Sequence, residues 1–129
     1  VIHSFSGSLE MAKEYIKLGF YLGVNGVITF KNCKLIEVYK EIGIQNIMLE
    51  TDSPYLTPVP FRGKQNYPGN IKYVAKFISE NLNISMEELA KITNSNVKKL
   101  FNISIWLAMI IYFFFILSVL YAIILCIRG

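Results

Sequence analysis

Two side chains that could bind a metal ion each follow a short apolar run of the chain. His3 comes directly after an apolar start, and Asp52 follows the apolar run 47–49, with Glu50 two positions before it. Carboxylates are costly to bury unless a cation or hydrogen-bond donors surround them. Histidine nitrogen together with aspartate oxygen suits several divalent metals, and a carboxylate beside metal-bound water can accept its proton. These residues therefore predict a metal site.

Each of these residues also has a simpler interpretation. His3 is the only histidine of the chain, and a single histidine is often a hydrogen-bonded structural residue. Glu50 could pair with a neighbouring lysine, and Asp52 could cap the turn that begins before Pro54. Residue type and spacing leave both interpretations open.

A third group of polar side chains lies in a proline-rich segment near the middle of the chain. Arg62 and Lys64 flank a glycine, and Asn66 follows them. A guanidinium binds phosphate as a planar fork and an ammonium binds it as a point charge, so the segment predicts a phosphate-binding loop. Phe61 and Tyr67 could stack on unpaired bases. The alternative is a solvated surface loop.

Apolar periodicity predicts the elements that must position these residues. Helical spacing predicts helices at 8–18, at 32–41, from about residue 70, from Ser85 with a capping box, and around 96–101. Short apolar runs predict strands at 20–24 and 44–49, whereas 27–30 could be extended or a loop. Strands that alternate with helices favour a parallel α/β sheet or barrel. A full (β/α)₈ barrel takes about 250 residues, so we expect 129 residues to form only part of one.

Charge and cysteine content restrict the function less than the motifs do. The formal net charge is +4, and because Arg128 is the only charged residue after Ser104, residues 1–104 carry +3. This excess is compatible with a polyanionic substrate and equally with a basic surface. Cys33 and Cys126 form no paired or metal-binding pattern, and we expect a reducing compartment.

The C-terminal segment has the composition of a membrane span. Residues 105–127 carry no charge, and about 20 apolar residues cross a bilayer. We predict a transmembrane helix here, preceded by a domain at 1–104 on the cytoplasmic side, because three lysines precede the segment and only Arg128 follows it. A buried hydrophobic helix and a mis-joined or out-of-frame extension are the alternatives. The start at Val1 instead of Met suggests a cut N-terminal boundary.

The motifs together closely resemble the TatD family of metal-dependent deoxyribonucleases over residues 1–103. The most specific is Glu-Thr-Asp-Ser-Pro-Tyr-Leu beside an Arg-Gly-Lys segment. In order, the matching strings are His-Ser-Phe-Ser-Gly at 3–7, Gly-Val-Ile-Thr-Phe-Lys at 26–31, Leu-Glu-Thr-Asp-Ser-Pro-Tyr-Leu-Thr-Pro at 49–58, Arg-Gly-Lys-Gln-Asn at 62–66 and Thr-Asn-Ser-Asn-Val-Lys-Lys-Leu-Phe at 93–101.

The resemblance implies a TIM barrel, of which this chain would be about the last three βα units. It also implies hydrolysis of DNA, single-stranded or at strand ends, with divalent metal ions: Mg²⁺ first, with Mn²⁺ or Zn²⁺ as alternatives. On that pattern His3 is a metal ligand, Asp52 a ligand or water-activating base, and Glu50 a supporting carboxylate of the catalytic site. Arg62 and Lys64 would bind the substrate phosphate.

The sequence departs from the family pattern in three ways. The family's His-x-His pair, bridging glutamate and fifth-strand histidine belong upstream of these residues, so the chain alone is expected to have little activity. Tyr67 stands where many relatives carry an acid, and the apolar tail is outside the pattern. Two other functions stay open: a related metal-dependent amide or ester hydrolase, and a non-catalytic remnant anchored in a membrane.

Overall fold

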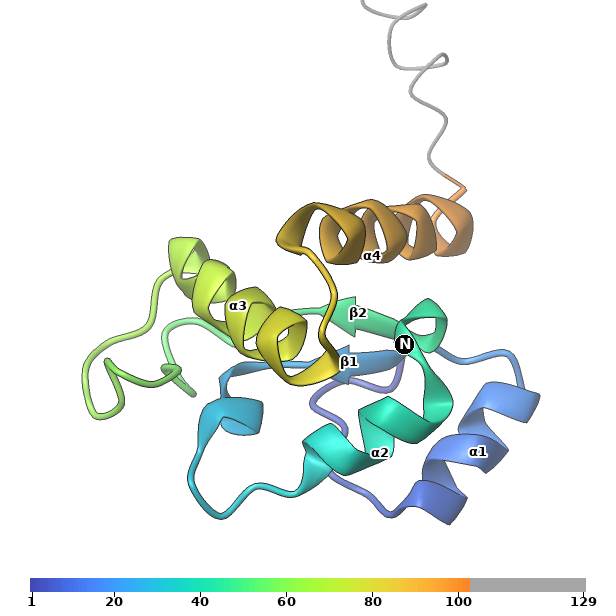
Figure 1. Ribbon diagram of the computed structural model, residues 1–129, viewed down its shortest axis with the longest axis horizontal. Helices are drawn as coiled ribbons and strands as arrows, with labels where there is room; N and C mark the ends of the chain where they lie inside the picture. Colours follow the sequence, from blue (N-terminus) through green and yellow to red (C-terminus); the bar gives the residue numbers. More distant parts are fainter. Residues whose placement is uncertain (103–129) are drawn as a thin grey trace, which may run out of the picture. The chain divides into compact units, whose positions relative to one another are not determined.

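The computed structural model describes residues 1–102 (Figure 1). The predicted span at 105–127 lies outside the described residues. Within the described part, no helix combines the length and the apolar composition that a membrane crossing needs. Contacts divide the chain into two units, Val1–Val97 and Lys98–Gly129, and the fold below is that of the first.

Helices alternate with short strands along the chain, as the sequence predicted. The elements, in order, are α1 (Leu9–Lys17), β1 (Leu22–Val24), the 3₁₀ helix η1 (Gly26–Thr29), α2 (Leu35–Ile42), the 3₁₀ helix η2 (Ile44–Asn46), β2 (Ile47–Leu49), the 3₁₀ helix η3 (Pro68–Asn70), α3 (Ile71–Leu82) and α4 (Met86–Leu100). Between β2 and η3 the chain forms a long irregular loop.

Three chain segments lie side by side in parallel at the centre of the fold. Leu22 of β1 is opposite Ile47 of β2, and on its other side Leu22 forms a parallel bridge with Ile2. The backbone order is therefore Ile2, β1, β2, with β1 in the middle. This arrangement confirms the expectation of an α/β fold with parallel strands, and it brings the carboxyl ends of three segments to the same edge.

Helix ends follow the capping residues that the sequence contains. The Ser8 hydroxyl accepts a hydrogen bond from the backbone N–H of Met11 at 3.3 Å at the start of α1. After that helix Gly19 has φ +82°, and Gly43 after α2 has φ +77°. Both values lie in the left-handed region that glycine adopts without steric cost. The predicted start and stop of α1 and the predicted stop of α2 are confirmed, whereas α2 begins at Leu35 and not at residue 32.

Two sequence predictions about local structure were wrong. The segment 44–49 is not one strand, because its first half forms η2 and only its second half forms β2. The two short helices predicted from Ser85 and around 96–101 are one continuous helix, α4. Asn96 explains the second error: its side-chain amide donates to the carbonyls of Ile44 and Ile47 at 3.1 and 2.8 Å, so a polar residue occupies a buried helix position. For the segment 27–30, left open by the sequence, the structure shows η1.

The core lies between the strands and the helices that cover them. α1 contacts β1 and α2, while α3 contacts β2, α2 and η1. The buried core residues are Phe5, Ala12, Leu22, Val24, Ile28, Ile36, Tyr39, Ile44, Ile47, Val74, Ile78 and Leu89. β1 is buried along its length and β2 is buried except at the half-buried Leu49, and the polar side chains begin just past the strand ends.

Candidate metal site

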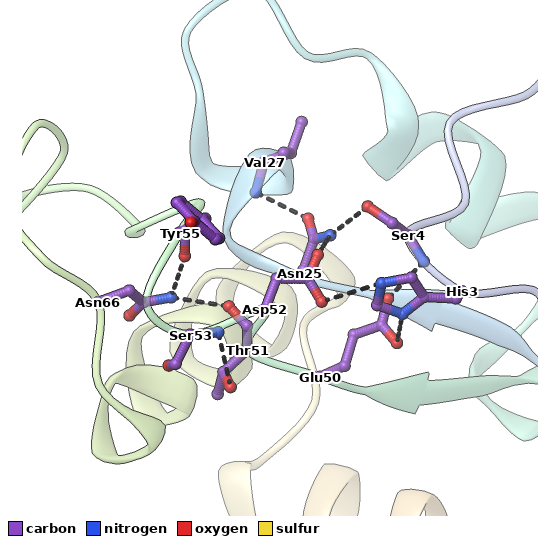
Figure 2. Close-up of polar contacts among 10 residues, drawn as sticks. All are labelled: His3, Ser4, Asn25, Val27, Glu50, Thr51, Asp52, Ser53, Tyr55 and Asn66. Carbon is purple, nitrogen blue, oxygen red and sulfur yellow. Dashed lines mark hydrogen bonds and ion pairs between the residues drawn. The ribbon is translucent and has the colours of Figure 1, made fainter.

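The polar side chains of the candidate site come from the ends of the three parallel segments. His3 follows Ile2, Asn25 follows β1, and Glu50 and Asp52 follow β2 (Figure 2). In an α/β barrel this edge of the sheet carries the active site. The structure thus brings together His3, Glu50 and Asp52, which the sequence singled out although they lie 47 and 49 positions apart.

Glu50 holds the ring of His3 from one side. Its Oε2 atom lies 2.9 Å from Nδ1 of His3, and its Oε1 atom accepts a hydrogen bond from the backbone N–H of Ser4 at 2.5 Å. Both carboxylate oxygens of Glu50 are therefore engaged. A carboxylate that binds one ring nitrogen of a histidine fixes the ring and leaves the other nitrogen as a metal ligand.

The second ring nitrogen of His3 faces Asp52. Its Nε2 atom lies 3.5 Å from Oδ1 of Asp52. Two ligand atoms at about 2.0 to 2.2 Å from one tetrahedral zinc ion are roughly 3.3 to 3.6 Å apart, and around octahedral Mg²⁺ they are about 2.9 Å apart. One donor atom from each of His3, Glu50 and Asp52 lies within 4.8 Å of the others. This donor set fits a divalent cation held by His3 and Asp52.

The electrostatics of the site favour a positive charge at His3. The hydrogen bond with Glu50 is the main cause that raises the pKa of His3 above its ordinary value, and the charges of Glu50 and Asp52 add to it. The His3 side chain is 70% exposed, whereas Asp52 is 11% exposed. The same negative charges that favour a proton on the ring would favour a divalent cation in its place.

Asn25 is part of this cluster, although the sequence did not single it out. Its side-chain amide donates to Oγ of Ser4 and to Oδ2 of Asp52, both at 2.6 Å. The residue is only 5% exposed. A signal was present in the sequence, because Asn25 directly follows an apolar strand, as His3 does.

Gly23 is the other missed residue. Because β1 lies between the segment of Ile2 and β2, the Glu50 side chain has to cross β1 to reach His3. It crosses at Gly23, where an added Cβ would lie 2.5 Å from Oε1 of Glu50. The strand has a glycine at the one position over which the carboxylate passes.

Arg62 and Lys64 both lie exposed on the loop that follows β2. The Arg62 guanidinium carbon lies 4.2 Å from the centre of the Phe30 ring, and the Lys64 ammonium lies 5.9 Å from the Phe61 ring centre. Among residues 1–102, neither cation forms an ion pair with a carboxylate. Their charges are therefore available to an anionic ligand.

Asn66, which the sequence predicted to contact phosphate, is buried. It is 2% exposed, and its amide nitrogen donates to the carbonyls of Thr51 and Tyr55 at 2.7 Å each. An amide has two N–H hydrogens, and in this conformation both are directed at backbone carbonyls. Asn66 thus ties the loop to the residue before Asp52, and its contact with phosphate stays a prediction.

The aromatic residues of the same loop border a hollow of about 360 Å³. It is lined by Phe61, Lys64, Gln65, Tyr67, Asn70 and Tyr73. Phe61 and Tyr73 meet edge to face, with ring centres 5.1 Å apart, and Tyr67 is 60% exposed. The hollow combines aromatic surface with one lysine. Two of its lining residues, Gln65 and Tyr67, flank Asn66 in the chain.

Comparison with known proteins finds relatives along nearly all of the described residues. Residues 1–102 match the sequence model of the family described as TatD related DNase. An uncharacterized metal-dependent hydrolase of Bacillus subtilis, YabD, is 50% identical over 105 residues, which are 81% of this chain and 41% of the relative. The Escherichia coli uncharacterized metal-dependent hydrolase YcfH is 38% identical over 104 residues, which are 80% of this chain and 39% of the relative. The chain thus spans about 40% of the length of these relatives.

A solved structure has a similar fold. The crystal structure of YJJV, a TatD homologue from Escherichia coli, superposes with a TM-score of 0.73 at 32% identity, over 79% of this chain and 40% of that one. A hydrolase of the TatD family from Entamoeba histolytica superposes with a TM-score of 0.62 at 25% identity, over 74% of this chain and 40% of that one.

Proposed function

This chain belongs to the TatD-related DNase family, and from that premise we propose that it contributes the carboxyl-terminal part of a metal-dependent site that hydrolyses DNA phosphodiester bonds. Metal-dependent hydrolysis is the shared description of the relatives. The observation that carries the proposal is the triad of His3, Glu50 and Asp52 at one edge of the parallel strands. Because the chain spans about 40% of its relatives, the activity is proposed for the whole protein that carries these residues.

His3 through Nε2 and Asp52 through Oδ1 would hold a divalent cation. Bound there, the cation would polarise a phosphoryl oxygen and lower the pKa of a water molecule. Glu50 acts through His3, because its hydrogen bond to Nδ1 fixes the ring with Nε2 toward Asp52. Asp52 would also accept a proton from a water molecule beside the cation. The imidazole nitrogen suits Zn²⁺ and the carboxylate oxygen suits Mg²⁺ and Mn²⁺, so the donor set leaves these three metals as candidates.

DNA as the substrate is supported by the loop after β2. Arg62 and Lys64 are exposed cations without a carboxylate partner among residues 1–102, as phosphate contacts require. The hollow beside Tyr67 could receive an unpaired base against an aromatic ring. An amide or ester substrate has no need of these cations, and no contact in the described residues favours it over a phosphodiester.

The whole protein should cleave a single-stranded oligonucleotide when Mg²⁺ or Mn²⁺ is present, and EDTA should stop the reaction. Bis(p-nitrophenyl) phosphate should be hydrolysed under the same conditions, and p-nitrophenyl acetate should serve as the ester control. Metal-dependent hydrolysis of the ester alone would show that the protein is an esterase and not a nuclease. Lack of any metal-dependent hydrolysis would contradict the proposal as a whole.

We also propose a cytoplasmic location for residues 1–102, with 105–127 as a membrane anchor. The support is the uncharged length of 105–127 and the three lysines that precede it. This orientation would put the site on the side of the membrane where a DNA-processing domain finds its substrate.

A further inference from the structure

Asn25 lies between Ser4 and Asp52 in the site. It follows β1, the middle one of the three parallel segments, and its side chain is enclosed between Ser4 and Asp52 (Figure 2). With 5% of its surface exposed, it has little contact with solvent. A buried amide needs its hydrogen bonds satisfied by the protein, so its partners define its orientation.

The direction of the Asn25 amide follows from its partners. Its Oδ1 atom lies 3.0 Å from the backbone nitrogen of Val27. A backbone N–H can only donate, so the oxygen has to face Val27 and the NH₂ group has to face the other side. On that side lie the Ser4 hydroxyl and the Asp52 carboxylate. Both N–H hydrogens of the Asn25 amide therefore have a partner in the site, one the Ser4 hydroxyl and the other the Asp52 carboxylate.

This contact selects which Asp52 oxygen is left for a metal ion. Oδ2 accepts from Asn25 at 2.6 Å, while Oδ1 faces Nε2 of His3 at 3.5 Å. A carboxylate that is held at one oxygen can no longer turn freely. Asp52 also has a φ of +55°, in the left-handed region that aspartate tolerates better than most residues, so both its backbone and its side chain are set toward the site.

Resting on the proposed metal-dependent function, we propose that Asn25 is a positioning residue that holds Asp52 with Oδ1 directed at the metal position. The amide acts together with Ser4. Ser4 accepts from Asn25 through Oγ and donates its backbone N–H to Glu50, so one chain of hydrogen bonds joins both carboxylates of the site. A neutral donor suits this role because it stabilises the Asp52 anion without bringing a positive charge that would repel the cation.

The test is the affinity of the whole protein that carries these residues for Mn²⁺, measured from the electron paramagnetic resonance signal of free Mn²⁺. The protein is kept in mild detergent because of the apolar segment 105–127, and no DNA is added. The first variant is Asn25→Ser: serine still caps η1, but it lacks the amide that reaches Asp52. Loss of a residue that orients a ligand typically weakens metal binding by about 10- to 100-fold, and we expect a reduction in that range.

Two further variants separate positioning from folding. Ser4→Ala removes only one neutral hydrogen-bond partner and should weaken Mn²⁺ binding by roughly 2- to 10-fold. Asn46→Ser is the matched control, because the Asn46 amide donates to the carbonyl of Ile42 at 2.6 Å, away from the site. It should leave Mn²⁺ affinity unchanged. Thermal melts with EDTA record the stability of each variant independently of the metal.

The outcomes distinguish the inference from the function on which it rests. Weaker Mn²⁺ binding by Asn25→Ser, with Asn46→Ser unaffected, supports the positioning role. Equal affinity in Asn25→Ser and the unaltered chain overturns it, even where the melting temperature falls, and leaves the metal site in place. If the whole protein binds no Mn²⁺ and its Asp52→Asn variant behaves identically, the metal site is refuted and the role of Asn25 with it.

Discussion

The carboxylate of Glu50 lies directly over Gly23. A Cβ atom added to this glycine would lie 2.5 Å from Oε1, 2.6 Å from Cδ and 2.6 Å from Oε2 of Glu50. These are distances at which something must move, and the flexible end of Glu50 can move more readily than the backbone of a buried strand. The glycine is therefore needed for the position of Glu50 more than for the fold.

Gly23→Ala should displace the Glu50 carboxylate from His3 while the protein stays folded. The pKa of His3 should then fall toward its ordinary value, because the hydrogen bond with Glu50 is the main cause that raises it. His3 is the only histidine, so its proton NMR signals can be followed through a pH titration without assignment. Gly69→Ala is the control, since an added Cβ there meets nothing within 4 Å. An unchanged titration in Gly23→Ala would contradict this account.

Glu50→Gln should lower the pKa of His3 directly, and it should change how stability depends on pH. The folded-state pKa of His3 lies above 6.5, so its pairing with Glu50 stabilises the metal-free fold at pH values below 6.5. That contribution is lost as the pH rises through the raised pKa. The melting temperatures of the Glu50→Gln variant and the unaltered protein should therefore differ more at about pH 5.5 than at about pH 8.5. A difference that is larger at pH 8.5 would have the wrong sign.

Asp52→Asn should remove most activity of the whole protein and leave its fold intact. The amide keeps the shape of the side chain but loses the charge that would bind the cation and accept a proton from water. We expect a decrease of about 100-fold or more in the rate, the range of a lost general base. The rate is measured on a single-stranded oligonucleotide, with melting as the folding control. A variant that retains the full rate would exclude Asp52 from the site.

Lys64→Ala should weaken DNA binding and make it less dependent on salt. One lost phosphate contact reduces the slope of log K against log[salt] by roughly 0.7 for a single strand. The measurement is the fluorescence anisotropy of a labelled oligonucleotide with EDTA at several salt concentrations. Lys34→Ala is the matched control, because Lys34 is also exposed and lies on another part of the fold. Equal slopes for both variants would show that Lys64 is a solvated surface residue that does not contact phosphate.

Residues 105–127 should stay with the membrane after carbonate extraction, because 23 uncharged residues are enough to cross a bilayer. Protease added to vesicles with the cytoplasmic face outward should digest residues 1–102. Recovery of the chain in the soluble fraction would refute the span, and protection of the N-terminal part would refute the orientation.

Local chemistry allowed the sequence to predict most of the elements and to single out all three residues of the triad by their position. Ser8, Gly19 and Gly43 mark helix ends through their own backbone or hydroxyl preferences. His3 and Asp52 could be recognised because a polar side chain just past a buried apolar strand needs hydrogen-bond partners or a cation. These signals depend on neighbours along the chain, and the sequence contains them completely.

The roles of Gly23, Asn25 and Asn66 were decided by the tertiary structure. Gly23 has its role only because β1 lies between His3 and Glu50. Asn25 and Asn66 are both buried, but one amide faces a carboxylate of the site and the other faces backbone carbonyls of the loop. An asparagine donates equally well to either partner. Which partner it meets depends on the order of parallel segments that are distant in the sequence, and local residue preferences do not encode that order.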